Sequence, residues 1–408
     1  MLRLTSRLAT HLVHFWRRIF YSRLLTARRT LLHRVAQLLL SHCESLADAP
    51  TVRLAAPEQL EVAYSRRGCA LSFSPGEPPL TDDGLAAACE LTLEYSVNSS
   101  SPRFFNQLSQ RVDPVAVAGE WIAATTNTNA MTYEIAPVVT LMERAVIARF
   151  AAAVGPRFAA AHDGLFVPGS SIGNLYALLL ARDRAAPSLR QTGAAGGPRL
   201  VAFVSSDAHF SFAKGAAVLG LGLDNLVRVA TDARGRMDVG ALRDAVAAAR
   251  AAGGTPFFVG ATAGSTVLGA FDDLRAIRAV CDAERMWLHA DAAWGGAALF
   301  SPTHRGLLDG VDAADSVACS LHKMLGVALQ AAVFVARAAG ALDSNKYDAS
   351  YLYQRDKLHA SMDLGDRSIQ VGCCLPPLPP RAHPSLIRPP RDRSIHSAGG
   401  SPTPSRPG

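Results

Sequence analysis

Apolar and polar positions change along the middle of the chain in a repeating order. Short apolar runs of strand type occur at residues 200–204, 226–229, 256–261, 286–290 and 316–319. Stretches with one apolar face at helical spacing lie between them, at residues 238–252 and 272–284. The short runs predict buried strands and the longer stretches predict amphipathic helices. Repetition of strand, helix and strand predicts an α/β fold with a mainly parallel sheet and right-handed crossovers.

Helical periodicity also marks the first third of the chain. Residues 28–41 and 82–96 carry apolar positions on one helical face, and residues 138–153 predict a long amphipathic helix. Residues 48–79 contain Pro and Gly without a clear period, so they predict a linking stretch. The sequence therefore predicts a helical segment ahead of the sheet.

Composition indicates a protein large enough for a substantial core. The chain has 408 residues, of which 49% are hydrophobic, enough for two or three domains. Of the formal net charge of +7, residues 1–42 carry +8 and residues 375–408 carry +4, so residues 43–374 carry −5. This distribution argues against a nucleic-acid groove. No apolar run reaches the ~18 residues of a membrane-spanning helix, so we expect no membrane span.

Seven widely separated cysteines show no metal-binding spacing. The odd count and wide separations indicate free thiols in a reducing compartment. The cysteines are Cys43, Cys69, Cys89, Cys281, Cys319, Cys373 and Cys374.

The two ends of the chain differ in composition from its body. Residues 1–30 are rich in Arg, Leu, Ser and Thr and contain no acid, which is typical of an organellar transit peptide. We expect a mitochondrial or plastid address in residues 1–25, with a cytoplasmic location as the alternative. Residues 375–408 hold ten of the 24 prolines, which predicts an extended tail without a core.

Two motifs supply the candidate chemistry. Asp291 follows the strand at 286–290 within Trp-Leu-His-Ala-Asp-Ala-Ala-Trp-Gly-Gly, and Lys323 follows the strand at 316–319 within Ser-Leu-His-Lys-Met. Both should reach the carboxyl edge of the sheet, where α/β proteins bind ligands. A lysine amine can condense with the aldehyde of pyridoxal 5'-phosphate (PLP), and an aspartate can keep its ring nitrogen protonated. From spacing alone, an exposed Asp and an exposed Lys on separate loops remain the alternative.

These two motifs resemble the cofactor motifs of the group II PLP-dependent amino-acid decarboxylases. Within that group they are similar to the branch that contains glutamate decarboxylase and cysteine sulfinate decarboxylase, over residues 31–372. The resemblance implies a large domain of PLP fold type I, the aspartate aminotransferase-like fold, and a homodimer. We expect a targeting segment at 1–25, a helical segment at 26–100, a PLP-binding large domain at 101–372 and a Pro-rich tail at 373–408. Relatives carry a small C-terminal domain where this tail stands.

The resemblance implies a set of cofactor-binding residues. They are Gln107, Gly169, Ser170, Ser171, His209, Thr266, His289, Asp291, Ala293, Ser320, His322 and Lys323. The small-residue turn at 169–171 precedes a helix, and backbone N–H groups there suit a phosphate. His209 is expected to stack on the ring, with Ala293 on the opposite face. His289 is expected to orient Asp291 by a hydrogen bond.

The segment around Tyr351 resembles the flexible catalytic loop of the same family. The resemblance implies that Tyr351 donates a proton at Cα and that the loop serves the site of the partner subunit. Three positions depart from the family pattern: Ser170 replaces a glycine, Gly173 replaces a serine, and Ser320 stands in place of an asparagine.

Substrate motifs point in two directions. Glu-Trp-Ile at 120–122 and Asn-Thr-Asn at 127–129 resemble glutamate decarboxylases, whereas the words at 266–272 and 349–352 resemble cysteine sulfinate decarboxylases. We expect decarboxylation of an acidic L-amino acid, glutamate to 4-aminobutyrate first, with cysteine sulfinate or aspartate as alternatives. A non-catalytic, decarboxylase-like interaction protein is a third reading that the Pro-rich tail leaves open.

Overall fold

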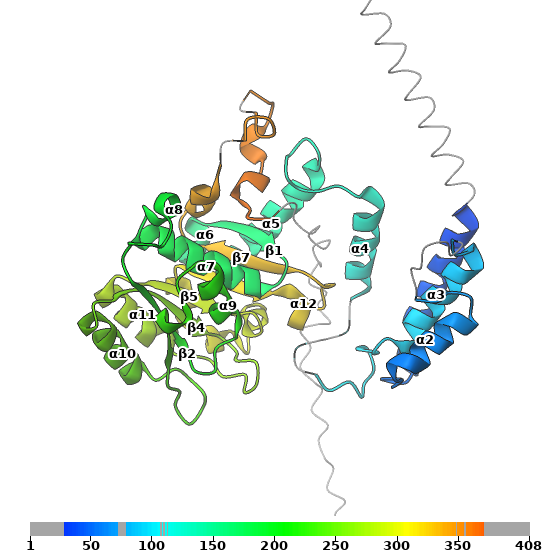
Figure 1. The fold of residues 1–408 in the computed structure, drawn as a ribbon, viewed down its shortest axis with the longest axis horizontal. Helices are drawn as coiled ribbons and strands as arrows, with labels where there is room; N and C mark the ends of the chain where they lie inside the picture. Colours follow the sequence, from blue (N-terminus) through cyan, green and yellow to red (C-terminus); the bar gives the residue numbers. More distant parts are fainter. Residues whose placement is uncertain are drawn as a thin grey trace, which may run out of the picture. The chain divides into compact units, whose positions relative to one another are not determined.

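The computed structural model describes residues 28–71, 79–106, 108, 111, 113–347, 349–354 and 356–370. The chain divides into two compact units, Met1–Arg111 and Val112–Gly408, each described here by itself (Figure 1). The sequence placed the corresponding boundary at residue 100. The expected targeting segment, the Pro-rich tail and Gln107 lie outside the described residues.

The first unit is helical. Residues 28–45 form a helix, and α3 (Asp82–Tyr95) begins at Thr81, whose hydroxyl accepts the Gly84 N–H at 3.1 Å. Both helices were predicted.

The prediction of a link over residues 48–79 was wrong in part, because α2 (Pro57–Arg66) lies within it. Pro57 occupies the first turn of α2, where its missing N–H costs nothing, and the Gln59 side chain accepts the N–H of Ala56 at 2.8 Å. The buried Tyr64 hydroxyl bonds Thr92 of α3 at 2.9 Å. Pro57, which in the sequence indicated an interruption of helical structure, therefore lies in the first turn of this helix.

A seven-stranded sheet forms the centre of the second unit, in the order β1-β7-β6-β5-β4-β2-β3. Strands β6, β5, β4, β2 and β3 pair in parallel, and β7 runs antiparallel to both β1 and β6. This mixed, mostly parallel sheet confirms the expected fold class. The strands are β1 (Asp163–Val167), β2 (Leu200–Ser205), β3 (Leu226–Val229), β4 (Thr255–Thr262), β5 (Trp287–Asp291), β6 (Ser316–Ser320) and β7 (Ala332–Ala336).

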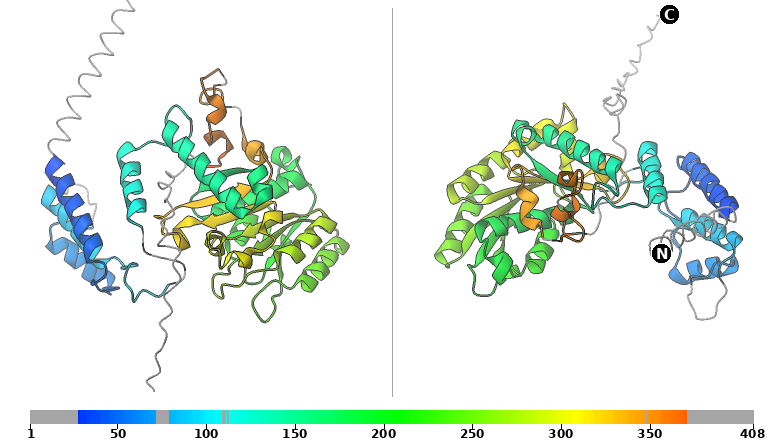
Figure 2. Two further views of the ribbon diagram at one scale, coloured as in Figure 1. Left: turned by 180° about the vertical axis from the view of Figure 1, so that it is seen from behind. Right: turned by 90° about the horizontal axis from the view of Figure 1, so that it is seen from above.

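Helices cover both faces of the sheet. Helices α7 and α9 lie on one face, and α5, α10 and α11 lie on the other (Figure 2). The predicted helices at 138–153, 238–252 and 272–284 are confirmed as α5, α10 and α11. The helices of this unit are α4 (Pro114–Thr126), α5 (Pro137–Val154), α6 (Pro156–Ala160), α7 (Ser170–Ala185), α8 (Leu189–Thr192), α9 (Ser211–Val218), α10 (Val239–Ala251), α11 (Leu274–Glu284) and α12 (Leu321–Met324).

One glycine brings α7 close to the sheet. A Cβ atom on Gly173 would lie only 2.8 Å from the Cβ of Ala318 in β6. Because a normal carbon–carbon contact is about 3.5–4.0 Å, a side chain here would push the helix away. Gly173, one of the departures from the family pattern, therefore sets the distance between the first turns of α7 and the carboxyl edge of the sheet.

Among the described residues, no helix is both long and apolar enough to cross a membrane. The five cysteines in this part of the chain are free thiols.

Candidate active site

The carboxyl ends of β4, β5 and β6 meet at one edge of the sheet. Asp291 ends β5, is only 4% exposed, and pairs in register with Thr262 of β4 and Ala318 of β6. The chain beyond β6 stays at this edge, because the Ser320 N–H donates to the Ala293 carbonyl at 3.1 Å. Lys323 follows three residues later in α12, so the predicted acid and amine lie at the same edge.

Both oxygens of the Asp291 carboxylate accept hydrogen bonds. Oδ2 accepts from the side-chain amide of Asn174 in α7 at 2.8 Å, and Oδ1 accepts from the Ala293 N–H at 3.1 Å. The carboxylate is therefore oriented from two directions, by a helix above the sheet and by its own turn.

His209 lies half-buried just before α9. Its Nδ1 is 2.9 Å from the Ser211 hydroxyl, and that hydroxyl oxygen accepts from the Asn174 amide at 2.9 Å. Burial lowers the pKa of His209; the charge of Asp291 opposes this shift, and that of Lys323 adds to it.

Cys319, the residue before the end of β6, responds to the same two charges. Burial raises the pKa of its thiol to about 12, Lys323 lowers that pKa, and Asp291 raises it. The acid, the amine and the imidazole thus lie within electrostatic reach of one another, as the PLP hypothesis requires.

His289 is fully buried and does not take the predicted partner. Its Nε2 lies 2.9 Å from Asn174 Oδ1, and its Nδ1 lies 2.9 Å from the Ser316 hydroxyl. Side chains two residues apart on a strand point in parallel, about 7 Å from each other, so the amide of Asn174 bridges His289 to Asp291. The predicted direct bond between His289 and Asp291 is corrected to this indirect one. Burial lowers the pKa of His289 to about 4, while Asp291 acts to raise it.

The first turn of α7 has the features of an anion site. Gly169 precedes the helix at φ 90°, and a Cβ placed on it would meet no heavy atom within 4 Å. The partial positive charge at the start of a 16-residue helix favours a bound anion there. Ser170 is buried and its hydroxyl lies 2.8 Å from that of Ser320, whereas Ser171 is exposed.

The remaining predicted residues are more dispersed. Nδ1 of His322 lies 2.6 Å from the Ala331 carbonyl, and burial lowers the His322 pKa. Thr266 lies in the turn that follows β4. Tyr351 is 85% exposed, in a turn far along the chain from the other site residues.

Sequence reasoning missed four polar residues that support the site: Trp287, Ser316, Ser211 and, above all, Asn174. Asn174 follows Ser170 by four positions, so both side chains lie on the same face of α7. This spacing was visible within Gly-Ser-Ser-Ile-Gly-Asn and is the signal that could have found it.

The set of groups fits PLP. A buried carboxylate suits the ring nitrogen, the half-buried imidazole of His209 suits a ring face, Lys323 suits the aldehyde, and the open turn at Gly169 suits the phosphate.

Comparisons with known proteins agree with this chemistry. The family profile described as the pyridoxal-dependent decarboxylase conserved domain matches residues 73–374. The cysteine sulfinic acid decarboxylases of Rattus norvegicus and Homo sapiens are each 46% identical over 287 residues, which is 70% of this chain. The chain spans 58% of the length of these relatives.

Solved structures share the fold. A crystal structure of mouse CSAD has a TM-score of 0.80 at 38% identity, covering 86% of this chain and 72% of that one. Oryza sativa TDC with PLP and tryptamine has a TM-score of 0.72 at 26% identity, covering 84% of this chain and 71% of that one. A matched profile over most of the chain, joined to an acid, an amine and an anion site at one sheet edge, places this protein in the pyridoxal-dependent decarboxylase family.

Proposed function

We propose that the protein is a PLP-dependent decarboxylase of an acidic amino acid, with cysteine sulfinate as the first substrate. The observation that carries the proposal is the buried Asp291 carboxylate, held by Asn174 at the edge that also bears Lys323. Relatives named cysteine sulfinic acid decarboxylase, at 46% identity, favour the alternative reading of the sequence over its first choice of glutamate. Glutamate and aspartate remain the comparison substrates.

Different residues at the sheet edge would hold different parts of the cofactor. Lys323 would hold its aldehyde, Asp291 would accept the hydrogen bond of its ring nitrogen, and His209 and Ala293 would lie against its two faces. Gly169, Ser170, Ser171, Ser320 and His322 would hold its phosphate, with Thr266 near the ring and His289 acting through Asn174. Gln107, outside the described residues, stays a candidate for contact with cofactor and substrate. When bound, PLP withdraws electrons from the substrate bond that breaks at Cα.

The protein groups contribute orientation and charge. Asp291 presents its carboxylate in one orientation, because both oxygens are already engaged by donors. Burial lowers the pKa of His209 below its ordinary value, which favours a neutral, flat partner that adds no second positive charge beside Lys323.

Proton delivery is assigned to Tyr351 of a second copy in a homodimer. Its phenol is 85% exposed in the single chain, which leaves it free to enter a site on another copy. A proton donated at Cα after loss of carbon dioxide completes the amine product.

Product analysis tests the proposal. The purified chain with added PLP is incubated separately with cysteine sulfinate, glutamate and aspartate, and carbon dioxide and amine are measured. We expect carbon dioxide to be released fastest from cysteine sulfinate. The Lys323→Ala variant should lose decarboxylation activity by roughly 10³-fold or more. Borohydride should fix the cofactor on Lys323 and bleach its visible absorption. A chain that carries PLP on Lys323 and releases carbon dioxide from none of the three substrates overturns the proposal.

A further inference from the structure

We infer that Asn174 is a positioning residue that orients Asp291 and His209 together, and that a one-way chain of hydrogen bonds from Trp287 through Ser316 and His289 holds the Asn174 amide in place. The inference rests on the proposed function, because it assigns Asp291 and His209 to the cofactor. It concerns residues that contact the cofactor-binding groups and not the cofactor itself.

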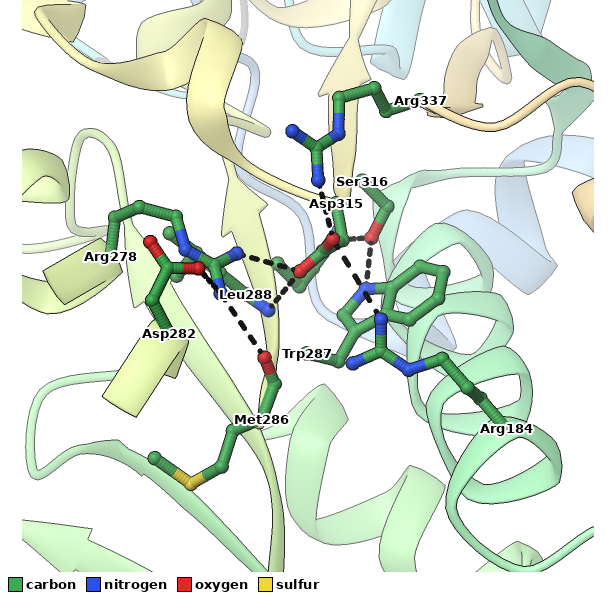
Figure 3. A network of polar contacts seen from close by, with 10 residues as sticks. Arg184, Arg278, Asp282, Met286, Trp287, Leu288, Asp315, Ser316 and Arg337 are labelled. Carbon is green, nitrogen blue, oxygen red and sulfur yellow. Dashed lines mark hydrogen bonds and ion pairs between the residues drawn. The ribbon is translucent and has the colours of Figure 1, made fainter. Parts of the chain in front are cut away.

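The hydrogen-bond chain starts at a group that can only donate. The indole N–H of Trp287 lies 2.8 Å from the Ser316 hydroxyl oxygen (Figure 3). Because indole has no acceptor, Ser316 must accept this bond. The same hydroxyl lies 2.9 Å from Nδ1 of His289.

The carboxylate end of the chain determines which nitrogen of His289 carries the proton. Asp291 only accepts, so the NH₂ group of Asn174 faces it and Asn174 Oδ1 faces Nε2 of His289 at 2.9 Å. Nε2 of the neutral ring therefore carries the proton, and Nδ1 accepts from Ser316. Burial, which lowers the pKa of His289 to about 4, keeps the ring neutral near pH 7. The amide of Asn174 cannot turn over, since its NH₂ group would then face the Nε2–H of His289.

The two N–H groups of Asn174 are used at the site. One donates to Asp291 Oδ2 at 2.8 Å and the other to the Ser211 hydroxyl at 2.9 Å. Nδ1 of His209 accepts the Ser211 backbone N–H at 3.2 Å and lies 2.9 Å from the Ser211 hydroxyl, which leaves the His209 proton on Nε2. One amide therefore orients both the acid and the imidazole.

The chain admits a single arrangement. It begins at an indole that only donates and ends at a carboxylate that only accepts, and every member between them is buried. A reversed bond inside a low-dielectric interior would leave a donor facing a donor, at a cost of about 1–3 kcal/mol.

Trp287, where the hydrogen-bond chain starts, has charged neighbours. The guanidinium of Arg184 lies 4.7 Å from the centre of the Trp287 ring, and Arg278 and Arg337 bond the Asp315 carboxylate beside it (Figure 3). This cluster lies where β5 and β6 begin, whereas Asp291 ends β5. Orientation is thus transmitted along the sheet from its amino edge to its carboxyl edge.

Two substitutions interrupt the chain at different points. Trp287→Phe removes the indole N–H at the start of the hydrogen-bond chain and keeps an aromatic ring beside Arg184, and Ser316→Ala removes the donor to His289. Thr140→Val is the matched control, because Thr140 is fully buried in α5 and its hydroxyl bonds only the Ala136 carbonyl.

The first measurement is ¹⁵N NMR of His289 in protein without added PLP. In the wild type we expect a bare Nδ1 and a protonated Nε2 from pH 5.5 to 8. Trp287→Phe and Ser316→Ala should each shift the Nδ1 resonance, because Nδ1 loses its oriented donor, while Thr140→Val should leave that resonance unchanged. The second measurement is PLP affinity by absorbance, which should fall about tenfold or more in the two variants and stay unchanged in the control.

Unchanged His289 spectra and unchanged PLP affinity in both variants would overturn the inference. Failure of the proposed function has a different signature: the wild type would release carbon dioxide from none of the three substrates, whereas the NMR result needs neither cofactor nor substrate.

Discussion

The hydroxyls of Ser170 and Ser320 lie 2.8 Å apart and join the first turn of α7 to the end of β6. Both residues depart from the family pattern, where a glycine and an asparagine are usual. The two departures therefore meet in one buried contact, and each supplies the partner that the other needs.

This contact predicts coupling between the two serines. Ser170→Ala and Ser320→Ala should each lower the free energy of unfolding by about 1 kcal/mol, because each leaves one buried hydroxyl unpaired. The double variant should lose less than the sum of the two, with a coupling of about 0.5–1.5 kcal/mol. Urea unfolding of the four proteins measures the cycle, and additive losses would contradict the prediction.

Close packing at Gly173 predicts a penalty for any side chain there. Gly173→Ala places its Cβ 2.8 Å from that of Ala318, so we expect a loss of about 1–3 kcal/mol of unfolding free energy. The double variant Gly173→Ala with Ala318→Gly removes the clashing methyl group and serves as the control. It should recover part of the loss in chemical denaturation, and no recovery would argue against the contact.

The buried imidazole of His289 predicts acid sensitivity. Its folded-state pKa of about 4 lies below the ordinary 6.5, so the folded state binds fewer protons than the unfolded state between these values. The contribution of His289 to the free energy of unfolding is fully present above pH 6.5. It is lost as pH falls towards 4, by roughly 3 kcal/mol at most. The difference in unfolding free energy between wild type and His289→Gln should shrink over that range, and a constant difference would contradict the assignment.

Asp272 predicts that the free energy of unfolding changes with pH in the opposite direction over the same range. Burial raises its pKa to about 6, although the N–H groups of Met237 and Thr262 donate to its two oxygens at 2.7 Å. The folded state therefore binds more protons between pH 3.8 and 6, and stability falls as pH rises through this range, by roughly 3 kcal/mol at most.

Substitution of Asp272 separates the two slopes. Asp272→Asn lacks the titrating carboxyl, so its unfolding free energy should rise more steeply from pH 4 to 6 than that of the wild type. Its overall stability should be lower, because one backbone N–H loses its acceptor. Parallel curves for the two proteins would show that Asp272 does not titrate there.

The exposed Tyr351 predicts complementation between subunits. Lys323→Ala and Tyr351→Phe should each lose decarboxylation, but a mixed dimer contains one site with an intact lysine and an intact tyrosine from different chains. Random mixing should therefore restore about a quarter of wild-type activity. If Tyr351 acts within its own chain, the mixture should remain as inactive as the separate variants.

Periodicity predicted the strands that lead to Asp291 and Lys323, because a buried parallel strand is a short apolar run between longer helical stretches. It missed β1 and β7, the two strands that enter the sheet's antiparallel pairs with each other and with β6. Asn174 was missed for a different reason. Its partners Asp291 and His289 lie more than a hundred residues away, and no local pattern records a contact of that range.

The reversal at β7 has a consequence for Lys323. Ser320 and Ala332 are register partners on β6 and β7, so residues 321–331 leave the sheet and return to it at one point. A parallel return would have carried the chain to the far edge and needed a crossover of a dozen or more residues. The antiparallel turn instead makes the lysine segment a short loop tied at both ends, which keeps the amine at the rim where an incoming aldehyde can reach it.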